Sequence, residues 1–366
     1  MTIRQHRERH AADPPTVRGR AGVADQAPKP GVFRGAKGRI LGLGIALLAT
    51  ILVALLSLMI GSNQLPAATA FDALFHYDKL NDDQTIVRSL RVPRTVIGLL
   101  AGVALGLAGA VMQGVSRNPL ADPGILGVNA GATVAVLTAV QFFGVTTLLG
   151  YVWFAFGGAG VAVVLVYLIA SLGRDGATPV KLALAGMAIT ALLTSLATLI
   201  QLMDIRTMDA YRAWAVGSLA GRGADIANDV WPFVALGTVV ALASGRILNA
   251  LALGDDVARA LGQNVGRARA LCGFTIVLLA GAATAAAGPI VFIGLTVPHI
   301  ARAMVGPDYR WILPYSAVLA PILLLTADII GRLALAPAEL QVGIVTAFLG
   351  APVFVALVRR RNLASL

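Results

Sequence analysis

The sequence predicts an all-α, polytopic membrane protein with about ten transmembrane helices. Hydrophobic residues make up 57% of the 366-residue chain and charged residues only 13%, about half the charged share of a soluble domain. Beyond residue 40 the chain repeatedly shows apolar runs of roughly 20 residues, the length that crosses a bilayer as a helix. We place these runs at 40–60, 95–115, 124–143, 148–172, 180–203, 231–248, 270–287, 289–305, 312–331 and 342–358.

The first 39 residues differ in composition from everything that follows. They hold nine lysines and arginines against three acids and no apolar core, a composition typical of disorder. We expect a disordered, basic cytosolic tail at 1–39, a transmembrane domain at 40–361 and a cytosolic C-terminal end at 362–366. The tail serves as a topology anchor or, alternatively, binds anionic headgroups of membrane lipid.

The distribution of charge predicts the orientation in the membrane. An even number of spans puts both termini on one side, and assigning them to the cytosol places 21 of the 29 lysines and arginines there. The positive-inside rule favours this arrangement. We therefore expect a multi-pass protein of the cytoplasmic (inner) membrane with both termini cytosolic. In a soluble protein the net charge of +11 would suggest nucleic acid, but here we expect no such partner.

Residues 91–132 are the most informative stretch. A basic head, Arg91-Val92-Pro93-Arg94, leads into the apolar run 95–115, and a polar break at 116–124 with two prolines follows. Proline removes a backbone donor and disfavours helix at the residue before it. Irregular backbone of this kind is tolerated near a bilayer only where protein buries it or it lines a wet cavity. The glycines at 98, 102, 106 and 109 place small residues on one helix face, which predicts close helix packing.

This stretch resembles the FecCD-type permease family, the membrane subunits of ABC importers for iron-siderophores, haem and cobalamin. The likeness extends over about 42–361 and is nearest to the enterobactin-type iron-siderophore permeases. The motifs that carry it are R-x-P-R at 91–94, M-Q-G at 112–114, R-N-P-L-A-D-P-G-I-L-G-V-N-A-G-A at 117–132 and G-P-I-x-F-I-G-L-x-x-P-H-x-x-R at 288–302.

The resemblance implies a type II ABC importer permease fold and a transport function. The chain would move an iron(III)-siderophore complex, with haem or cobalamin as the alternative substrates. The implied partners are a second permease subunit, identical or a sister chain, two ABC ATPase subunits and an extracytoplasmic substrate-binding protein. Neither enzymatic activity nor a cofactor is expected in this chain, because ATP and magnesium would bind the ATPase, and no G-x-x-x-x-G-K-[ST] motif occurs in the sequence.

The resemblance also assigns residues to both membrane faces. At the outer face, Arg91, Arg94 and Arg332 would be docking positions for acidic residues of the binding protein. Snorkelling to lipid headgroups is the simpler interpretation. At the inner face, Asn118, Leu120 and, less securely, Thr178 match the cytosolic gate.

The inner loop at about 246–269 is the candidate coupling segment. Asp255 or Asp256 can cap a short helix that Gly262 can end, and a second short helical piece is expected before the seventh span. A helix lying on the lipid surface is the alternative to a docking element. The family motif A-L-G-D-D-x-A-x-x-L-G assigns the ATPase-coupling role to Gly254, Asp255, Asp256, Ala260, Leu261 and Gly262.

Two residues test other classes of function. Asp328 lies in the ninth run and would suggest a secondary transporter driven by an ion gradient, but Arg332 four residues on can neutralise it. His299 follows Pro298, and no second histidine or cysteine keeps helical spacing with it, so we expect a structural role and no metal site. An intramembrane enzyme would need a catalytic constellation that the sequence lacks.

Overall fold

The protein is a single bundle of α-helices in the computed structural model, which describes residues 32–33, 35–61, 65–145, 147–172, 178–204, 211–212 and 214–360. Most of the predicted tail and the whole of the predicted C-terminal end lie outside these residues. The first helix begins at Gly35, five residues before the predicted start of the transmembrane domain. No strand occurs in the described ranges.

Every predicted apolar run corresponds to a helix. Seven of these helices are long and apolar enough to cross a membrane, and α5, α13 and α15 are shorter apolar helices. The ten are α1 (Gly35–Met59), α4 (Val92–Ser116), α5 (Val128–Phe143), α6 (Leu148–Ser171), α7 (Pro179–Met203), α9 (Ala224–Ala243), α12 (Val265–Ala287), α13 (Ile293–Val305), α14 (Tyr309–Ala334) and α15 (Val342–Arg360).

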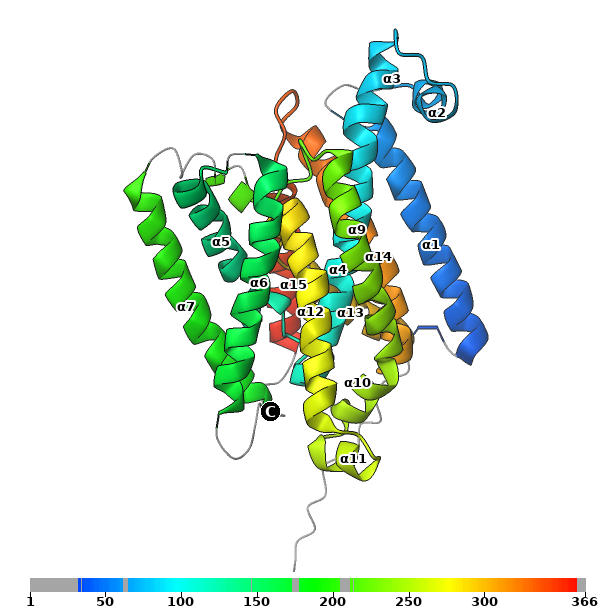
Figure 1. Ribbon diagram of the computed structural model, residues 1–366. Coiled ribbons are helices and arrows are strands. Elements are labelled where there is room, and N and C mark those ends of the chain that lie inside the picture. The colour runs from blue at the N-terminus through cyan, green and yellow to red at the C-terminus, as the bar shows by residue number, and fades with distance from the viewer. Residues whose placement is uncertain are drawn as a thin grey trace, which may run out of the picture.

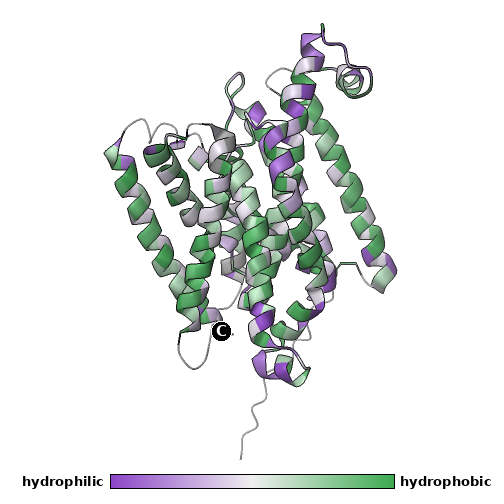
Figure 2. Cartoon of the chain, in the orientation of Figure 1, coloured by the Kyte–Doolittle hydropathy of each residue, from purple (hydrophilic) through white to green (hydrophobic). Residues whose placement is uncertain are grey.

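Short helices extend the bundle at its two ends. At one end α2 (Ala67–Phe75) and α3 (Asp82–Ile86) precede a π-helical turn, Val87–Arg91, that runs on into α4. At the opposite end α10 (Gly245–Ala252) and α11 (Asp255–Ala260) stand beneath α12 (Figure 1). Hydrophobic residues cover the middle of the bundle and hydrophilic residues gather at these two ends (Figure 2). This banding is what a bilayer requires of a protein that crosses it.

Helix α4 lies at the centre of the bundle, and the predicted glycine face explains how. A Cβ added at Gly102 would lie 2.6 Å from Pro321 Cα of α14, and one at Gly98 or Gly106 would meet Leu325 or Ser316 of the same helix. A Cβ at Gly109 would collide with the main chain of Gly294. The glycines therefore let α4 approach α14 and α13 closely, as predicted.

The polar break after α4 is irregular backbone that is exposed at its start, at Arg117 and Asn118, and buried further on, at Ala121 and Pro123. Arg117 ends α4 in the left-handed conformation, with φ of 52°, and a short 3-10 turn, Pro123–Leu126, leads into α5. The ring of Pro123 lies against Gly294, and the carbonyl of Ile125 leaves no room for a side chain at Gly186 of α7. The 16-residue α5 is only about 24 Å long at 1.5 Å per residue. The predicted span at 124–143 is therefore partly irregular and shorter than a full crossing helix.

We predict that Gly109→Ala lowers the thermal stability of the detergent-solubilised protein. The added methyl group would press on main-chain atoms of Gly294, which cannot rotate away, and overpacking of this kind costs about 1–3 kcal/mol. Gly273→Ala in α12 is the matched control, because nothing lies within 4 Å of a Cβ added there and alanine favours the helix. Thermal midpoints by fluorescence-detected size exclusion give the comparison, and equal midpoints would contradict the packing argument.

Candidate functional site

Two of the three arginines predicted at the outer face, Arg94 and Arg332, bind one buried carboxylate. Asp328 in α14 accepts hydrogen bonds from Arg94 Nε at 3.0 Å and Nη2 at 2.8 Å, and from Arg332 Nε at 2.9 Å. Asp328 and Arg332 are each 1% exposed. The predicted pair of Asp328 with Arg332 is confirmed, but it lies inside the bundle and does not snorkel. A buried carboxylate needs such partners, because an uncompensated charge is costly away from water.

Arg91 and Arg332 also cap the end of α1. Arg91 Nη1 donates to the carbonyls of Leu58 and Met59 at 2.9 and 2.7 Å, and Arg332 Nη1 donates to those of Ser57 and Ile60 at 2.7 and 2.9 Å. The last carbonyls of a helix lack partners within it and carry partial negative charge, so cations stabilise them. The two arginines therefore fasten α1 to α4 and α14.

The burial of Arg91 and Arg332 differs from the expectation of exposed docking residues. Only one edge of the cluster reaches the surface: Arg94 Nη1 pairs with Glu339 Oε2 at 2.7 Å, with side chains 12% and 28% exposed. Sequence reasoning missed Glu339, because no local pattern links this loop residue to Arg94, which lies 245 positions earlier. We name these five residues, Arg91, Arg94, Asp328, Arg332 and Glu339, the outer cluster.

At the inner face the coupling segment forms a short helix, as predicted, but not with the predicted cap. Gly254, with φ of 103°, precedes α11, and neither aspartate side chain caps the helix. Asp255 instead pairs with Arg269 and Arg117, and Asp256 pairs with Arg259 at the surface. Backbone geometry explains the difference, since Asp255 is already the first helical residue.

The end of α11 agrees better with the sequence. Gly262 has φ of 82°, and its N–H donates to Arg259 O at 2.9 Å, as in a glycine-terminated helix. Leu261, Val257 and Ala260 are exposed, so an apolar face is open at the inner end. The predicted second short helix is absent from residues 262–269, because Asn264 caps α12 directly by accepting a bond from Arg267 N at 3.0 Å.

The three gate candidates all lie at helix ends. Asn118 Oδ1 accepts a hydrogen bond from Leu120 N at 2.9 Å, closing a tight turn after α4. Thr178 Oγ1 caps α7 by accepting one from Lys181 N at 3.3 Å. Asn118 is exposed and Leu120 half-buried. The structure thus unites the first two in one turn, and their gating role stays a prediction.

A second buried polar group was missed by the sequence reasoning. Gln113 of the M-Q-G motif donates to Leu295 O at 3.1 Å and accepts from Arg302 Nη2 at 3.3 Å. Arg302 also donates to Tyr309 Oη at 3.2 Å. Gln113 thereby satisfies backbone oxygen at the start of α13 inside the bundle. The two family motifs at 112–114 and 288–302 were the sequence signal that could have indicated this group, because Gln113 of the first motif bonds to Leu295 and Arg302 of the second.

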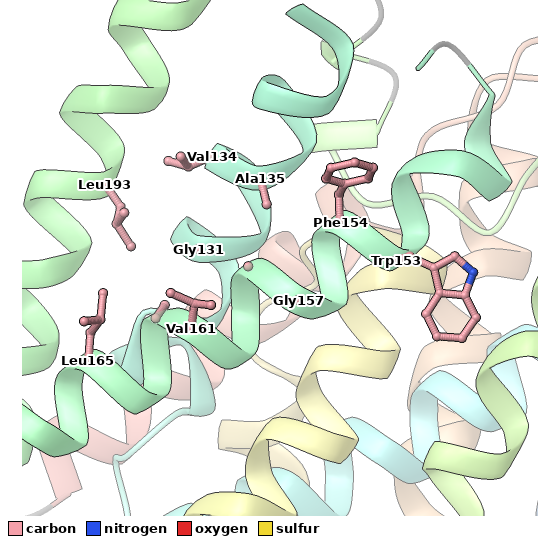
Figure 3. Close-up of a pocket in the computed structure, with 11 residues that line it drawn as sticks. Gly131, Val134, Ala135, Trp153, Phe154, Gly157, Val161, Leu165 and Leu193 are labelled. Carbon is pink, nitrogen blue, oxygen red and sulfur yellow. The ribbon is translucent and has the colours of Figure 1, made fainter. Parts of the chain in front are cut away.

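An open apolar groove of about 520 Å³ lies between α5, α6 and α7. Val161 and Leu165 of α6 face Leu193 of α7 across it, with Val134 of α5 beside them (Figure 3). A second groove of about 680 Å³ follows α15 from Ala347 to Arg359. Both suit lipid chains or another apolar helix, and neither gathers the polar groups of an active site. Among the described residues no cluster of histidine, cysteine, aspartate or glutamate could hold a metal ion.

A bundle of apolar helices with hydrophilic residues at its two ends is the architecture of a multi-pass membrane protein. Residues 48–360 match the FecCD transport family, and the chain belongs to that family. The ferric enterobactin transport system permease protein FepD of Escherichia coli (strain K12) is 47% identical over 316 residues, covering 86% of this chain and 94% of the relative.

Further relatives and a solved structure agree. The iron(3+)-hydroxamate import system permease protein FhuB of Bacillus subtilis (strain 168) is 41% identical over 319 residues, covering 87% of this chain and 82% of the relative. A solved chain, described as an inward-facing conformation of an ABC transporter assigned to the metal-chelate type, superposes with a TM-score of 0.77 at 28% identity. The match covers 88% of this chain and all of the other.

We predict that Arg332→Ala destabilises the protein far more than Arg88→Ala. Removing Arg332 takes one charge partner from the buried Asp328 and a cap from α1, and breaking a buried pair costs about 3–5 kcal/mol. Arg88 is the matched control, because it is exposed and stacks only over Tyr77 at 4.6 Å, a contact worth about 0.5–1 kcal/mol. Thermal midpoints in detergent measure both, and a fully stable Arg332→Ala protein would show that the cluster is not structural.

Proposed function

We propose that this chain is the permease subunit of an ABC importer that moves an iron(III)-siderophore complex across the cytoplasmic membrane. The observation that carries the proposal is the 47% identity, over nearly the whole of both chains, to a ferric enterobactin permease. The hydroxamate permease supports the same substrate class. Energy comes from ATP hydrolysed on two separate ATPase subunits, and the complex needs a second permease chain and an extracytoplasmic binding protein.

The inner face is the end that carries α10 and α11. Charge sorting by the positive-inside rule supports this orientation, with both termini in the cytosol. Helix α11 holds exposed Leu261 and Val257 at the far tip of the bundle. A short ordered helix with an open apolar face suits a groove of the ATPase.

Several helices expose apolar side chains to the membrane, and α7 and α15 are two of them. On α7, Leu192, Leu196 and Leu199 are exposed, and on α15 Phe348 and Val355 are exposed. Such a surface within the membrane meets either lipid or another helix. We propose that the partner permease covers the α15 surface and that the substrate path runs between the two chains, with membrane lipid against the outer helices.

The binding protein docks at the outer cluster. Arg94 is its accessible arginine, so acidic residues of the binding protein would compete there with Glu339. Arg91 and Arg332 support this position from within, by holding α1 and Asp328 in place. Arg94→Ala should therefore weaken docking, and it should also destabilise the protein, because it removes a charge partner from the buried Asp328.

Transport should depend on ATP and not on an ion gradient. We expect proteoliposomes holding both permease chains, ATPases and binding protein to take up radioactive iron bound to a catecholate siderophore. Uptake should stop with a non-hydrolysable ATP analogue and persist when an ionophore collapses the proton gradient. The opposite pattern would favour a secondary transporter. A cobalamin import permease of Halobacterium salinarum is 37% identical over 303 residues, so unlabelled cobalamin serves as a competitor, and strong competition would overturn the iron assignment.

We predict that Leu261→Asp separates the permease from its ATPase. The substitution places a charge on the apolar face of α11, and burying an unpaired charge at an interface is costly. The permease should still insert into the membrane, but the ATPase subunits should no longer co-purify. Leu80→Asp is the control, because Leu80 is also exposed but lies at the opposite, outer end, so this change should leave co-purification unchanged. Normal uptake by the Leu261→Asp protein would refute the coupling assignment.

A further inference from the structure

The carboxylate of Asp255 joins three separate elements at the inner face. Its Oδ1 lies 3.4 Å from Nη2 of Arg117, and both its oxygens lie 2.9 Å from Nη2 of Arg269. Asp255 is the first residue of α11, Arg117 is the C-cap residue of α4, and Arg269 lies in the second turn of α12. We name these three residues the inner triad.

Burial distinguishes the inner triad from an ordinary surface ion pair. The side chains of Arg269, Asp255 and Arg117 are 7%, 22% and 35% exposed. The neighbouring pair of Asp256 with Arg259 in the same helix is 99% and 60% exposed. Partly buried charges are screened less by water and salt, so the triad fixes its three elements more firmly than the neighbouring pair fixes α11.

The backbone on both sides of the contact is specialised. Arg117 holds φ of 52°, a conformation that non-glycine residues adopt rarely and only where their surroundings enforce it. Gly254 opposite has φ of 103°, and a Cβ added there would lie 3.7 Å from Nη1 of Arg117. The guanidinium of Arg117 therefore lies directly over the start of α11.

The position of Arg117 in the chain connects this contact to the predicted gate. Arg117 immediately precedes the turn of Asn118 and Leu120, the predicted cytosolic gate. The opposite end of α11 carries Leu261, the predicted ATPase contact. One helix of six residues thus has the ATPase face at its end and an ion pair to the gate turn at its start.

We propose that Asp255 is the positioning residue that passes movement of the ATPase-bound α11 to the gate turn, through its ion pair with Arg117. Arg269 keeps the carboxylate attached to the base of α12, so that the start of α11 and the base of α12 move together and Arg117 follows the moving carboxylate. This inference rests on the proposed import function and on the gate assignment. It adds a residue contact through which coupling and gating communicate.

The test uses the complete transporter, with permease chains, ATPases and binding protein. The single, buried cysteine, Cys272, is replaced by alanine, and a cysteine is introduced by Leu120→Cys. Thiol-labelling rates at position 120 are compared between the nucleotide-free complex and one trapped with ATP analogue. We expect the rate to change with nucleotide in this background, and to stay constant when Asp255→Asn is added.

Three further measurements separate coupling from assembly. In Asp255→Asn the ATPases should still co-purify and basal ATP hydrolysis should continue, while uptake falls more than about tenfold, the loss expected for a charge-assisted hydrogen bond. Arg117→Ala should behave likewise, and the double variant should be no worse than either single variant. Arg267→Ala, at an exposed site in the first turn of α12, is the matched control and should transport normally.

Each other result overturns the proposal. Nucleotide-dependent labelling and normal uptake in Asp255→Asn would mean that the carboxylate is not the link. Loss of ATPase co-purification would place Asp255 at the ATPase interface. Additive losses in the double variant would mean that Arg117 and Asp255 act separately. If labelling at position 120 ignores nucleotide while ATP-driven iron uptake proceeds, the gate link fails and the import function stands.

Discussion

Inside a bilayer every backbone N–H and C=O must be satisfied by protein, and this constraint governs the fold. The chain nevertheless keeps irregular backbone at 117–127 and 288–292. The first stretch lies against α13, where Pro123 contacts Gly294, and the second lies against Gly217 and Gly350, which closely approach Pro289 and Phe292. Gln113 supplies a donor to Leu295 O. Close glycine-mediated packing is therefore what lets non-helical segments persist between the helices.

Charge obeys the same constraint at the outer end. Asp328, 1% exposed, is bound by Arg94 and Arg332, and Arg332 also reaches the free carbonyls at the end of α1, as does Arg91. Arg332 thus neutralises a buried acid and caps a helix end with one side chain. The charged groups of the outer cluster are paired with each other or with backbone carbonyls inside the protein, and only the edge formed by Arg94 and Glu339 reaches the surface. A partner that binds this edge has to exchange one carboxylate for another.

The sequence predicted the features that depend on local pattern. Run length and hydropathy located all ten apolar helices, glycine spacing located the face of α4 that packs on α14, and Gly262 marked the end of α11. The predicted pair of Asp328 with Arg332 is also local, four residues apart. These features follow from periodicity and backbone preference, which a single sequence displays.

Contacts between distant segments escaped prediction. The pairing of Arg94 with Glu339, the capping of α1 by Arg91, and the pairing of Asp255 with Arg117 each join residues that lie far apart in the chain. Asp255 is the clearest example. The local pattern predicted that it caps a helix, whereas in the folded protein its carboxylate pairs with Arg117 and Arg269. Family resemblance marked Asp255 as functional without showing which contact it makes.

The packing of α4 also limits where the permease can move. Arg94 in its first turn belongs to the outer cluster, and Arg117 at its end belongs to the inner triad. Between them α4 meets α14 and α13 main chain to main chain at Gly102 and Gly109. Interiors packed this closely transmit displacement and do not absorb it, so α4, α13 and α14 shift as one body. The segments that can move relative to this body are then α11, the irregular turn after α4 and the helices beyond that turn, α5 to α7, and the predicted gate residues lie in the last two.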